Sequence, residues 1–534
     1  MQPRRPAGLA FLAPAGDDGW LLHGPETAEV IRIATTAALR AAVTEVERQD
    51  SPRWVWSDTA VIYPTLLEGD VRVSRCHDVG LSEALLAAYD GRPPKPELTA
   101  HPRQAPAQPA LFPDIPLEGS PDPLAVLAAA VRDQERQVAQ ARLESPGLPL
   151  LVAAESAAAL AAAEMSHVGL PWRCDIHDEL LTRLLGSRPS YGGRPPRLQE
   201  LAEQVAAALG VPRLNPDSQP EVLRAFRNIG IQLTSLRARE LRGVDHPSVE
   251  PLLRYKELAR LHSAHGWAWQ AQWVRDGRFH PEYMPGGVVS GRWATRGGGA
   301  LQIPRPVRAA VVADPGWVLV IADAGQLEPR ILAALSGDPG MVEATRSGDL
   351  YASVAAQALG RSQARDEAKI ALLSAMYGGG VGSPALAALR RHFPAALALL
   401  EDAARTGEDG GMVRSALGRT CPPPHADWQQ APEEIGLARA RARGRFTRNF
   451  VIQASAADWA NVLVATLRRR LERPAELVFF QHDEVIVHAP ADLAEAVVAA
   501  VAAGAAEATR LVVGERGVHI PMQAVVANSY AEKA

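Results

Sequence analysis

The stretch WVLVIADAGQLEPRILAALSGD, residues 317–338, joins an apolar β-prone run to a helical pattern, and Asp323 stands at the junction. A second stretch, LVFFQHDEVIVH at 477–488, has two β-prone runs around the polar residues 481–484. Each has an ordinary explanation, because Asp323 could cap the helix and polar residues are common in hairpin turns. Taken together, Asp323 and Asp483 at strand ends could hold two Mg²⁺ ions for phosphoryl transfer.

Between these stretches, ARDEAKIALLSAMYGGG at 364–380 predicts a helix. Arg365, Lys369, Leu373 and Tyr377 are spaced four residues apart and would share one stripe. Two cations and an aromatic ring suit a triphosphate and a base, although a solvated charged face is commoner for an isolated helix. The chain has only four lysines, so a lysine at 369 suggests a role for an ammonium that can release a proton.

Composition indicates a multi-domain protein of 534 residues with a net charge of −4. This charge is not that of a general nucleic-acid binder, so any such surface must be a local patch. Cys76, Cys174 and Cys421 form no closely spaced pair, which favours a reducing cytosol. No signal peptide is expected, and charges interrupt the alanine-rich segments, so we expect a soluble protein with no membrane span.

The pattern along the chain predicts several regions. Residues 1–90 combine helical segments with β-prone runs at 54–56 and 70–76, and residues 91–123 are a proline-rich linker or strap. Residues 124–275 are helical, a β-rich stretch follows near 280–322, and 326–472 are again mostly helical. The predicted pattern closes with the two β-prone runs around residues 481–484.

The order and spacing of these motifs resemble the family A DNA polymerases, typified by bacterial DNA polymerase I. The first palm motif reads DAGQLEPR at 323–330, the fingers motif is met at 365, 369, 377 and 378, and HDE stands at 482–484. Lesser matches are SGR at 290–292, LQIP at 301–304, DLY at 349–351, and Arg445, Asn449 and Gln453 followed by SAAD. The resemblance covers roughly residues 160–534.

The resemblance implies an α+β multi-domain chain with the right-hand polymerase fold. The palm would be an antiparallel sheet built from residues 276–336 and 437–534, with helical fingers at 337–436 and the thumb within 124–275. An α/β domain like ribonuclease H would precede it at 1–90.

The resemblance also implies template-directed DNA synthesis on primer–template DNA from deoxynucleoside triphosphates. Asp323, the carbonyl of Ala324 and Asp483 would hold two Mg²⁺ ions, with Mn²⁺ as a substitute, beside Glu484. Lys369 would be the general acid for the leaving pyrophosphate. The enzyme would be a cytoplasmic, nucleoid-associated monomer.

Further site residues follow from the same resemblance. The nucleotide would be bound by Arg365, Lys369, Tyr377, Gln326, Glu328, Leu373 and Tyr351. The DNA would be contacted by Arg292, Gln302, Arg445, Asn449, Gln453 and His482. The arginines at 439, 441, 443, 445 and 448 would supply the local basic patch.

Five positions depart from the family pattern. Leu373 stands where an aromatic residue usually packs on the incoming sugar, and Tyr351 stands where histidine is usual. Ala324 and Gly325 replace tyrosine and serine, and Pro329 replaces leucine, which is tolerable only in the first turn of a helix. These departures predict a slow or specialised enzyme.

The amino-terminal region should correspond to the family's 3′–5′ exonuclease, yet it lacks a D-x-E on a strand and a later Y-x3-D. The D-x-E at Asp133 to Glu135 falls in a predicted helix, and Asp58 is predicted to be a turn residue. We therefore expect a folded domain without nuclease activity.

Three alternatives remain. A single-subunit RNA polymerase shares the palm and fingers residues, but Glu328 beside the sugar would exclude a 2′-hydroxyl. A DNA-binding scaffold that has lost catalysis would account for the departures. A metal-dependent nuclease would have no use for the cationic stripe at 365–377.

Overall fold

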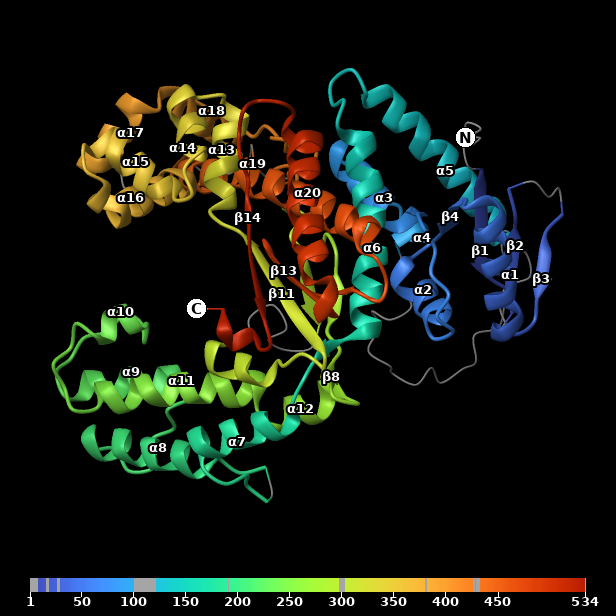
Figure 1. Ribbon diagram of the computed structural model, residues 1–534. Helices are drawn as coiled ribbons and strands as arrows, with labels where there is room; N and C mark the ends of the chain where they lie inside the picture. The colour runs from blue at the N-terminus through green and yellow to red at the C-terminus, as the bar shows by residue number, and fades with distance from the viewer. Residues whose placement is uncertain are drawn as a thin grey trace. The chain divides into compact units, whose positions relative to one another are not determined.

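The computed structural model describes residues 8–15, 19–25, 29–99, 122–190, 192–296, 303–379, 382–425, 428 and 433–533. The chain forms two compact units. The first comprises Met1–Val168, Glu282–Thr295 and Val320–Val526, and the second comprises Gly169–Pro281, Arg296–Leu319 and Ala527–Ala534. Figure 1 shows the course of the chain.

The amino-terminal part of the first unit is an α/β unit around a mixed sheet in the order β3-β2-β1-β4-β5. Strand β1 pairs antiparallel with β2 and parallel with β4, and β4 pairs parallel with β5. The strands are β1 (Leu9–Pro14), β2 (Trp20–His23), β3 (Ile31–Ile33), β4 (Arg53–Trp56) and β5 (Cys76–Asp78), and the helices are α1 (Thr36–Asp50), α2 (Thr59–Leu67) and α3 (Val79–Tyr89). The predicted α/β character is confirmed, whereas the ribonuclease H-like assignment stays a prediction.

One strand of this unit differs from the prediction. The β-prone run at 70–76 was expected to be a strand including Val71–Val73, but β5 begins at Cys76. Val71 N–H instead donates to the Leu66 carbonyl at the end of α2, and Asp70 has a φ of 54°. The backbone at 69–71 therefore closes a helix and is not available for a ladder.

Two longer helices follow the short helix α4 (Pro96–Thr99), which lies within the predicted linker. Residues 100–121 of that linker lie outside the described residues. Helix α5 (Pro123–Ala141) contains Asp133, as predicted, and α6 (Leu148–Val168) packs against α2 and α3. Of the region predicted as helical at 124–275, only residues from Gly169 onward belong to the second unit.

The rest of the first unit is a four-stranded sheet with helices. The strand order is β12-β13-β11-β14, and β12 and β13 form an antiparallel hairpin. The strands are β11 (Trp317–Ala324), β12 (Glu476–Gln481), β13 (Glu484–Pro490) and β14 (Met522–Ala527), and a separate pair is formed by β9 (Glu282–Met284) and β10 (Ala294–Arg296). In Figure 1 the helices α13 to α18 gather to one side of β11 and β13.

These helices carry most of the candidate site. They are α13 (Leu327–Ser336), α14 (Pro339–Thr345), α15 (Leu350–Leu359), α16 (Arg365–Tyr377), α17 (Pro384–His392), α18 (Pro394–Glu408), α19 (Glu433–Arg470) and α20 (Ala494–Val513). Helix α19 packs against α6, α18 and α20. It therefore connects the sheet, the amino-terminal part and the helical cluster of the first unit.

The second unit is a helical body with a small three-stranded sheet. Its helices are α7 (Cys174–Leu185), α8 (Pro196–Ala208), α9 (Gln219–Asn228), α10 (Ala238–Leu241), α11 (Val249–His265) and α12 (Trp267–Trp273). The sheet has the order β6-β8-β7, from Leu170–Pro171, Arg278–Phe279 and Val274–Arg275. An aromatic cluster of Trp172, Trp269 and Phe279 lies beside the sheet.

Three helices correct the expectation that no segment could span a membrane. By length and hydropathy, Leu148–Val168, Ile435–Arg470 and Ala491–Val513 all qualify. The apolar windows of the first two are 72% and 83% buried within the protein, and that of the third is 44% buried. A helix that is apolar on most faces is either a membrane span or a core helix. The packing of α6 and α19 is that of core helices.

Candidate active site

The end of β11 and the β12–β13 turn lie side by side. Strand β11 continues to Ala324, and α13 begins only at Leu327 with Gln326 as its N-cap residue. Asp323 therefore does not cap the helix, and that alternative is excluded. Asp483 lies with His482 in a two-residue hairpin turn, as predicted, and its carbonyl accepts a hydrogen bond from the Ala324 N–H at 3.0 Å. This backbone contact joins the two predicted acidic segments.

Electrostatics show that the two carboxylates interact. Burial raises the pKa of Asp483 to about 7, and the charge of Asp323 adds to the increase. Glu484 acts in the same direction, while Arg292 opposes it. A cation between the carboxylates would relieve this repulsion.

The donor set also fits the predicted metal. Two carboxylates and a backbone carbonyl are the hard oxygen ligands that Mg²⁺ prefers. Among the residues that the structure describes, no three His, Cys, Asp or Glu side chains are grouped to hold a metal. The predicted set needs only two such side chains. Glu484 is 7% exposed at the start of β13.

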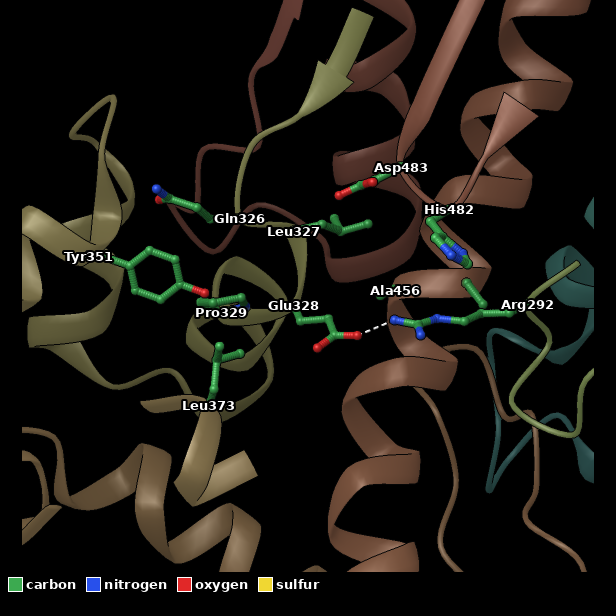
Figure 2. A pocket seen from close by; sticks show the side chains of 11 residues that line it. Arg292, Gln326, Leu327, Glu328, Pro329, Tyr351, Leu373, Ala456, His482 and Asp483 are labelled. Atoms are coloured by element: carbon green, nitrogen blue, oxygen red, sulfur yellow. Dashed lines mark hydrogen bonds and ion pairs between the residues drawn. The ribbon is translucent and has the colours of Figure 1, made fainter. Parts of the chain in front are cut away.

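A cavity of ≈ 260 Å³ opens beside Asp483. It is lined by Arg292, Gln326, Leu327, Glu328, Pro329, Tyr351, Leu373, Ala456, Ala457, His482 and Asp483. In Figure 2, Tyr351, Pro329 and Leu373 lie on one side and Asp483, His482 and Arg292 on the other, with Glu328 between them. The structure thus brings residues predicted to bind nucleotide and residues predicted to bind DNA into one cavity.

Glu328 is held by two of the predicted site residues. Its carboxylate forms an ion pair with Arg292, drawn in Figure 2, and accepts a hydrogen bond from the Tyr377 hydroxyl at 3.1 Å. Burial raises the pKa of Tyr377, with the charge of Glu328 as a further cause. The ion pair thus joins Arg292, predicted to contact DNA, to Glu328, predicted to contact the nucleotide.

Helix α16 confirms the predicted stripe. Arg365 begins the helix and Tyr377 ends it, with Gly378 in a left-handed conformation as the C-cap. The Arg365 guanidinium and the Lys369 ammonium lie 5.8 Å and 6.0 Å from the centre of the Tyr351 ring. Burial raises the pKa of Tyr351 to about 12, and the charge of Glu328 adds to the increase. Both cations of the stripe thus lie near the ring of Tyr351, a residue outside the stripe.

Asp349 is a site residue to which no role was assigned from sequence, although DLY was recognised as a signature. Its carboxylate accepts from Arg365 Nε at 2.5 Å and from Gln326 Nε2 at 2.8 Å. Burial acts to raise the pKa of Asp349, but the hydrogen bonds from Arg365 and Gln326 outweigh it and lower the pKa. Gln326 Oε1 also accepts from Leu350 N–H at 2.7 Å. Gln326 therefore fixes the start of α15 relative to α13.

Arg330, the last residue of the first palm motif, is fully buried and joins the segments around the start of α13. Its guanidinium donates to the carbonyls of Gly325, Thr345, His519, Ser347 and Gly348. Pro329 lies in the first turn of α13, as its presence required. The missing N–H of Pro329 therefore costs little.

Helix α19 carries Arg445, Asn449 and Gln453 at successive four-residue intervals, and Gln453 Nε2 lies 3.5 Å from the Tyr377 hydroxyl. The predicted basic patch stays a prediction, and three of its arginines, Arg441, Arg445 and Arg448, line one pocket. Arg443 donates to the carbonyls of Gly411 and Pro422, and Arg448 donates to that of Ala375. Both side chains are half-buried and donate to loop or helix-end carbonyls. Gln302 lies outside the described residues.

Comparison with solved structures identifies the fold. The chain is similar to the POL domain of Pol1 from M. smegmatis in complex with DNA primer-template and dNTP, with a TM-score of 0.73 and 18% identity. The match covers 98% of this chain and 95% of that one. The fold is therefore that of a polymerase domain, as predicted.

Sequence comparison gives the family. The profile of DNA polymerase family A matches residues 197–532, and the chain belongs to that family. The thermostable DNA polymerase I of Thermus thermophilus is 28% identical over 344 residues, covering 57% of this chain and 40% of the relative. DNA polymerase I of Chloroflexus aurantiacus is 27% identical over 315 residues, covering 53% and 32%. The chain thus matches less than half the length of these relatives.

Proposed function

We propose that the chain is a DNA-directed DNA polymerase, which adds deoxynucleoside triphosphates to a primer 3′-hydroxyl and releases pyrophosphate. The observation that carries this proposal is a single cavity with Asp483 at one margin and the cationic face of α16 near the other. Phosphoryl transfer needs both a carboxylate metal site and a place for the triphosphate. Family membership supports the same function, as does the description of the M. smegmatis structure as a complex with primer-template and dNTP.

Asp323, Asp483 and the Ala324 carbonyl would hold two Mg²⁺ ions, with Mn²⁺ as a substitute. When bound, such ions activate the attacking hydroxyl and stabilise the transition-state charge. Arg365 and Lys369 would bind the triphosphate, with Arg365 exchanging Asp349 for phosphate oxygens. Lys369 would then protonate the leaving pyrophosphate.

The remaining residues of the cavity would position the substrates. Glu328 would exclude a ribose 2′-hydroxyl, and Gln326, Tyr351, Leu373 and Tyr377 would surround the nucleotide. Arg292, Arg445, Asn449, Gln453 and His482 would contact primer–template DNA. The enzyme would act as a cytoplasmic monomer associated with the nucleoid.

We also propose that the amino-terminal α/β unit has no 3′–5′ exonuclease activity and serves as a brace. Strand β1, LAFLAP, carries no acidic residue, and Asp58 is the N-cap of α2. Two-metal hydrolysis requires several converging carboxylates. The test is incubation with a 3′-mismatched, labelled primer and Mg²⁺ or Mn²⁺ without nucleotides. Shortening that persists in an Asp323→Ala, Asp483→Ala double variant would show a live exonuclease.

Primer extension with deoxynucleotides and ribonucleotides in separate reactions tests the polymerase proposal. We expect extension with deoxynucleotides only. Equal extension with ribonucleotides would favour the RNA polymerase alternative, and no extension with either would favour the DNA-binding scaffold.

A further inference from the structure

Within the first unit, three charged side chains from distant segments meet in a buried cluster. Arg419, in the loop between α18 and α19, donates to Glu155 of α6 at 2.7 Å and to Asp458 of α19 at 3.0 Å. The side chains of Arg419, Glu155 and Asp458 are 6%, 2% and 0% exposed. We call Glu155, Arg419 and Asp458 the buried triad.

The hydrogen bonds around the buried triad are extensive. Asp458 also accepts from Ser415 Oγ at 2.5 Å, and Glu155 accepts from Asn461 Nδ2 at 2.8 Å. Burying three charges is costly, and well-packed apolar residues are often as stabilising. What the triad adds is a defined geometry, because each hydrogen bond fixes a direction as well as a contact.

The segment that lies against the triad is the turn at 285–292. A Cβ on Gly286 would lie 2.2 Å from Glu155 Oε1, and a Cβ on Gly291 would lie 2.3 Å from Arg419 Nε. Both glycines have positive φ, 64° and 83°. The turn therefore rests directly on two of the three triad residues, at positions where only glycine fits.

A second connection runs through Trp293. Its Nε1 donates at 2.7 Å to Asn461 Oδ1, and the same Asn461 side chain donates to Glu155. The Trp293 ring also packs edge-on against Phe480, with ring centres 4.6 Å apart. Phe480 lies near the end of β12, just before the turn that carries Asp483. Trp293, the residue after Arg292, is thus fixed both to the triad and to the β12–β13 hairpin that carries Asp483.

Arg292 stands between these two fixed points and extends into the cavity, where it pairs with Glu328 (Figure 2). We propose that the Glu155–Arg419–Asp458 triad is a positioning device for Arg292. It holds the turn at 285–292 in one conformation, so that Arg292 reaches the primer and Glu328 at the right place. This inference rests on the proposed polymerase function.

The test is a double-variant cycle of Arg419→Lys and Arg292→Ala in the full chain. Lysine keeps the charge at 419 but cannot reach both carboxylates with a planar fork. Single-turnover extension of a saturating matched primer–template is measured across nucleotide concentrations, together with the unfolding midpoint. We expect Arg419→Lys to slow the maximal rate by about 10-fold, since small displacements of a positioning group are costly.

The double variant decides the inference. If Arg419 acts through Arg292, the double variant should extend within about twofold of Arg292→Ala alone. The matched control is Arg414→Lys in the same loop, whose side chain is 37% exposed and should leave the rate unchanged. Gly291→Ala keeps all three triad side chains in the sequence but would press its Cβ against Arg419 and so separate the turn from the triad. It should reproduce the rate loss if Arg419→Lys fails to fold.

Several results would overturn the inference. An Arg419→Lys or Gly291→Ala enzyme with the wild-type rate would do so, as would losses that multiply in the double variant. In either case wild-type extension shows that the polymerase function itself stands. A wild-type protein that does not extend primers would instead overturn the proposed function, and the inference with it.

Discussion

The contact between the amino-terminal α/β unit and α19 depends on Arg468. Its guanidinium donates to Glu164 at 2.7 Å and 2.9 Å, to the Ser74 carbonyl at 2.9 Å, and to the Val73 carbonyl. The Tyr63 hydroxyl donates to the same Glu164 at 2.6 Å. The side chains of Arg468 and Glu164 are only 11% and 9% exposed. Arg468→Ala would leave Glu164 buried with its main partner missing.

Removing one partner of a buried ion pair costs about 3–5 kcal/mol. We expect Arg468→Ala to lower the free energy of unfolding by that amount, measured by urea denaturation followed by circular dichroism. The matched control is Arg469→Ala at the next position, whose side chain is 61% exposed and pairs with Glu507 at 2.8 Å. That exposed pair is worth about 0–1 kcal/mol. An Arg468→Ala variant no less stable than the control would refute the reasoning.

The specific activity of the Arg468→Ala variant should be unchanged although its stability falls. Gln453 and Arg468 are separated by about 22 Å along α19 at 1.5 Å per residue, so the variant should keep its specific activity while folded. Deleting residues 1–120 should likewise lower stability or solubility more than specific activity. Loss of activity without loss of stability would show that the amino-terminal unit takes part in synthesis.

Three further predictions concern single side chains. Lys369→Arg should cause a large loss of turnover with nucleotide binding retained, since guanidinium is a poor proton donor. Wild-type rates of this variant in single-turnover extension would show that Lys369 only binds phosphate. Glu328→Ala should admit ribonucleotides, and unchanged discrimination in parallel extension reactions would contradict the assigned role. Burial lowers the pKa of His177 to about 4. Its neutral form is therefore favoured by folding, and its contribution to stability is full above pH 6.5 and lost as the pH falls toward 4. By linkage this contribution amounts to about 3 kcal/mol. The free energy of unfolding, measured in urea, should therefore fall more steeply between pH 6.5 and pH 4 in wild type than in His177→Gln. Parallel curves of the two proteins against pH would contradict this.

The parts of the site that sequence predicted are those with local patterns. The strand before Asp323, the hairpin around Asp483 and the stripe on α16 follow from apolar runs, a polar turn and a four-residue spacing. These patterns depend on neighbours in the sequence, so they remain visible without a structure.

The parts that sequence did not predict depend on distant partners. Asp349 reaches Arg365 across a helix boundary, and Arg419 meets Glu155 from a position 264 residues away. The hydrogen bonds of Arg443 and Arg448 depend on distant carbonyls that need donors, which no charge pattern reveals. Val71–Val73 has strand propensity but forms no strand, and the Val71 N–H closes a helix instead, because tertiary context overrides propensity.

The measurement that tests the central claim most directly is single-turnover primer extension by Asp323→Ala and Asp483→Ala, beside wild type and Glu484→Ala. Losing a ligand that acts mainly in the transition state should slow extension by about a thousandfold or more, while duplex binding and the fold stay nearly intact. Glu484→Ala should be milder, because it is not required as a ligand. Appreciable synthesis by either aspartate variant would contradict the assignment of these two carboxylates as the metal site.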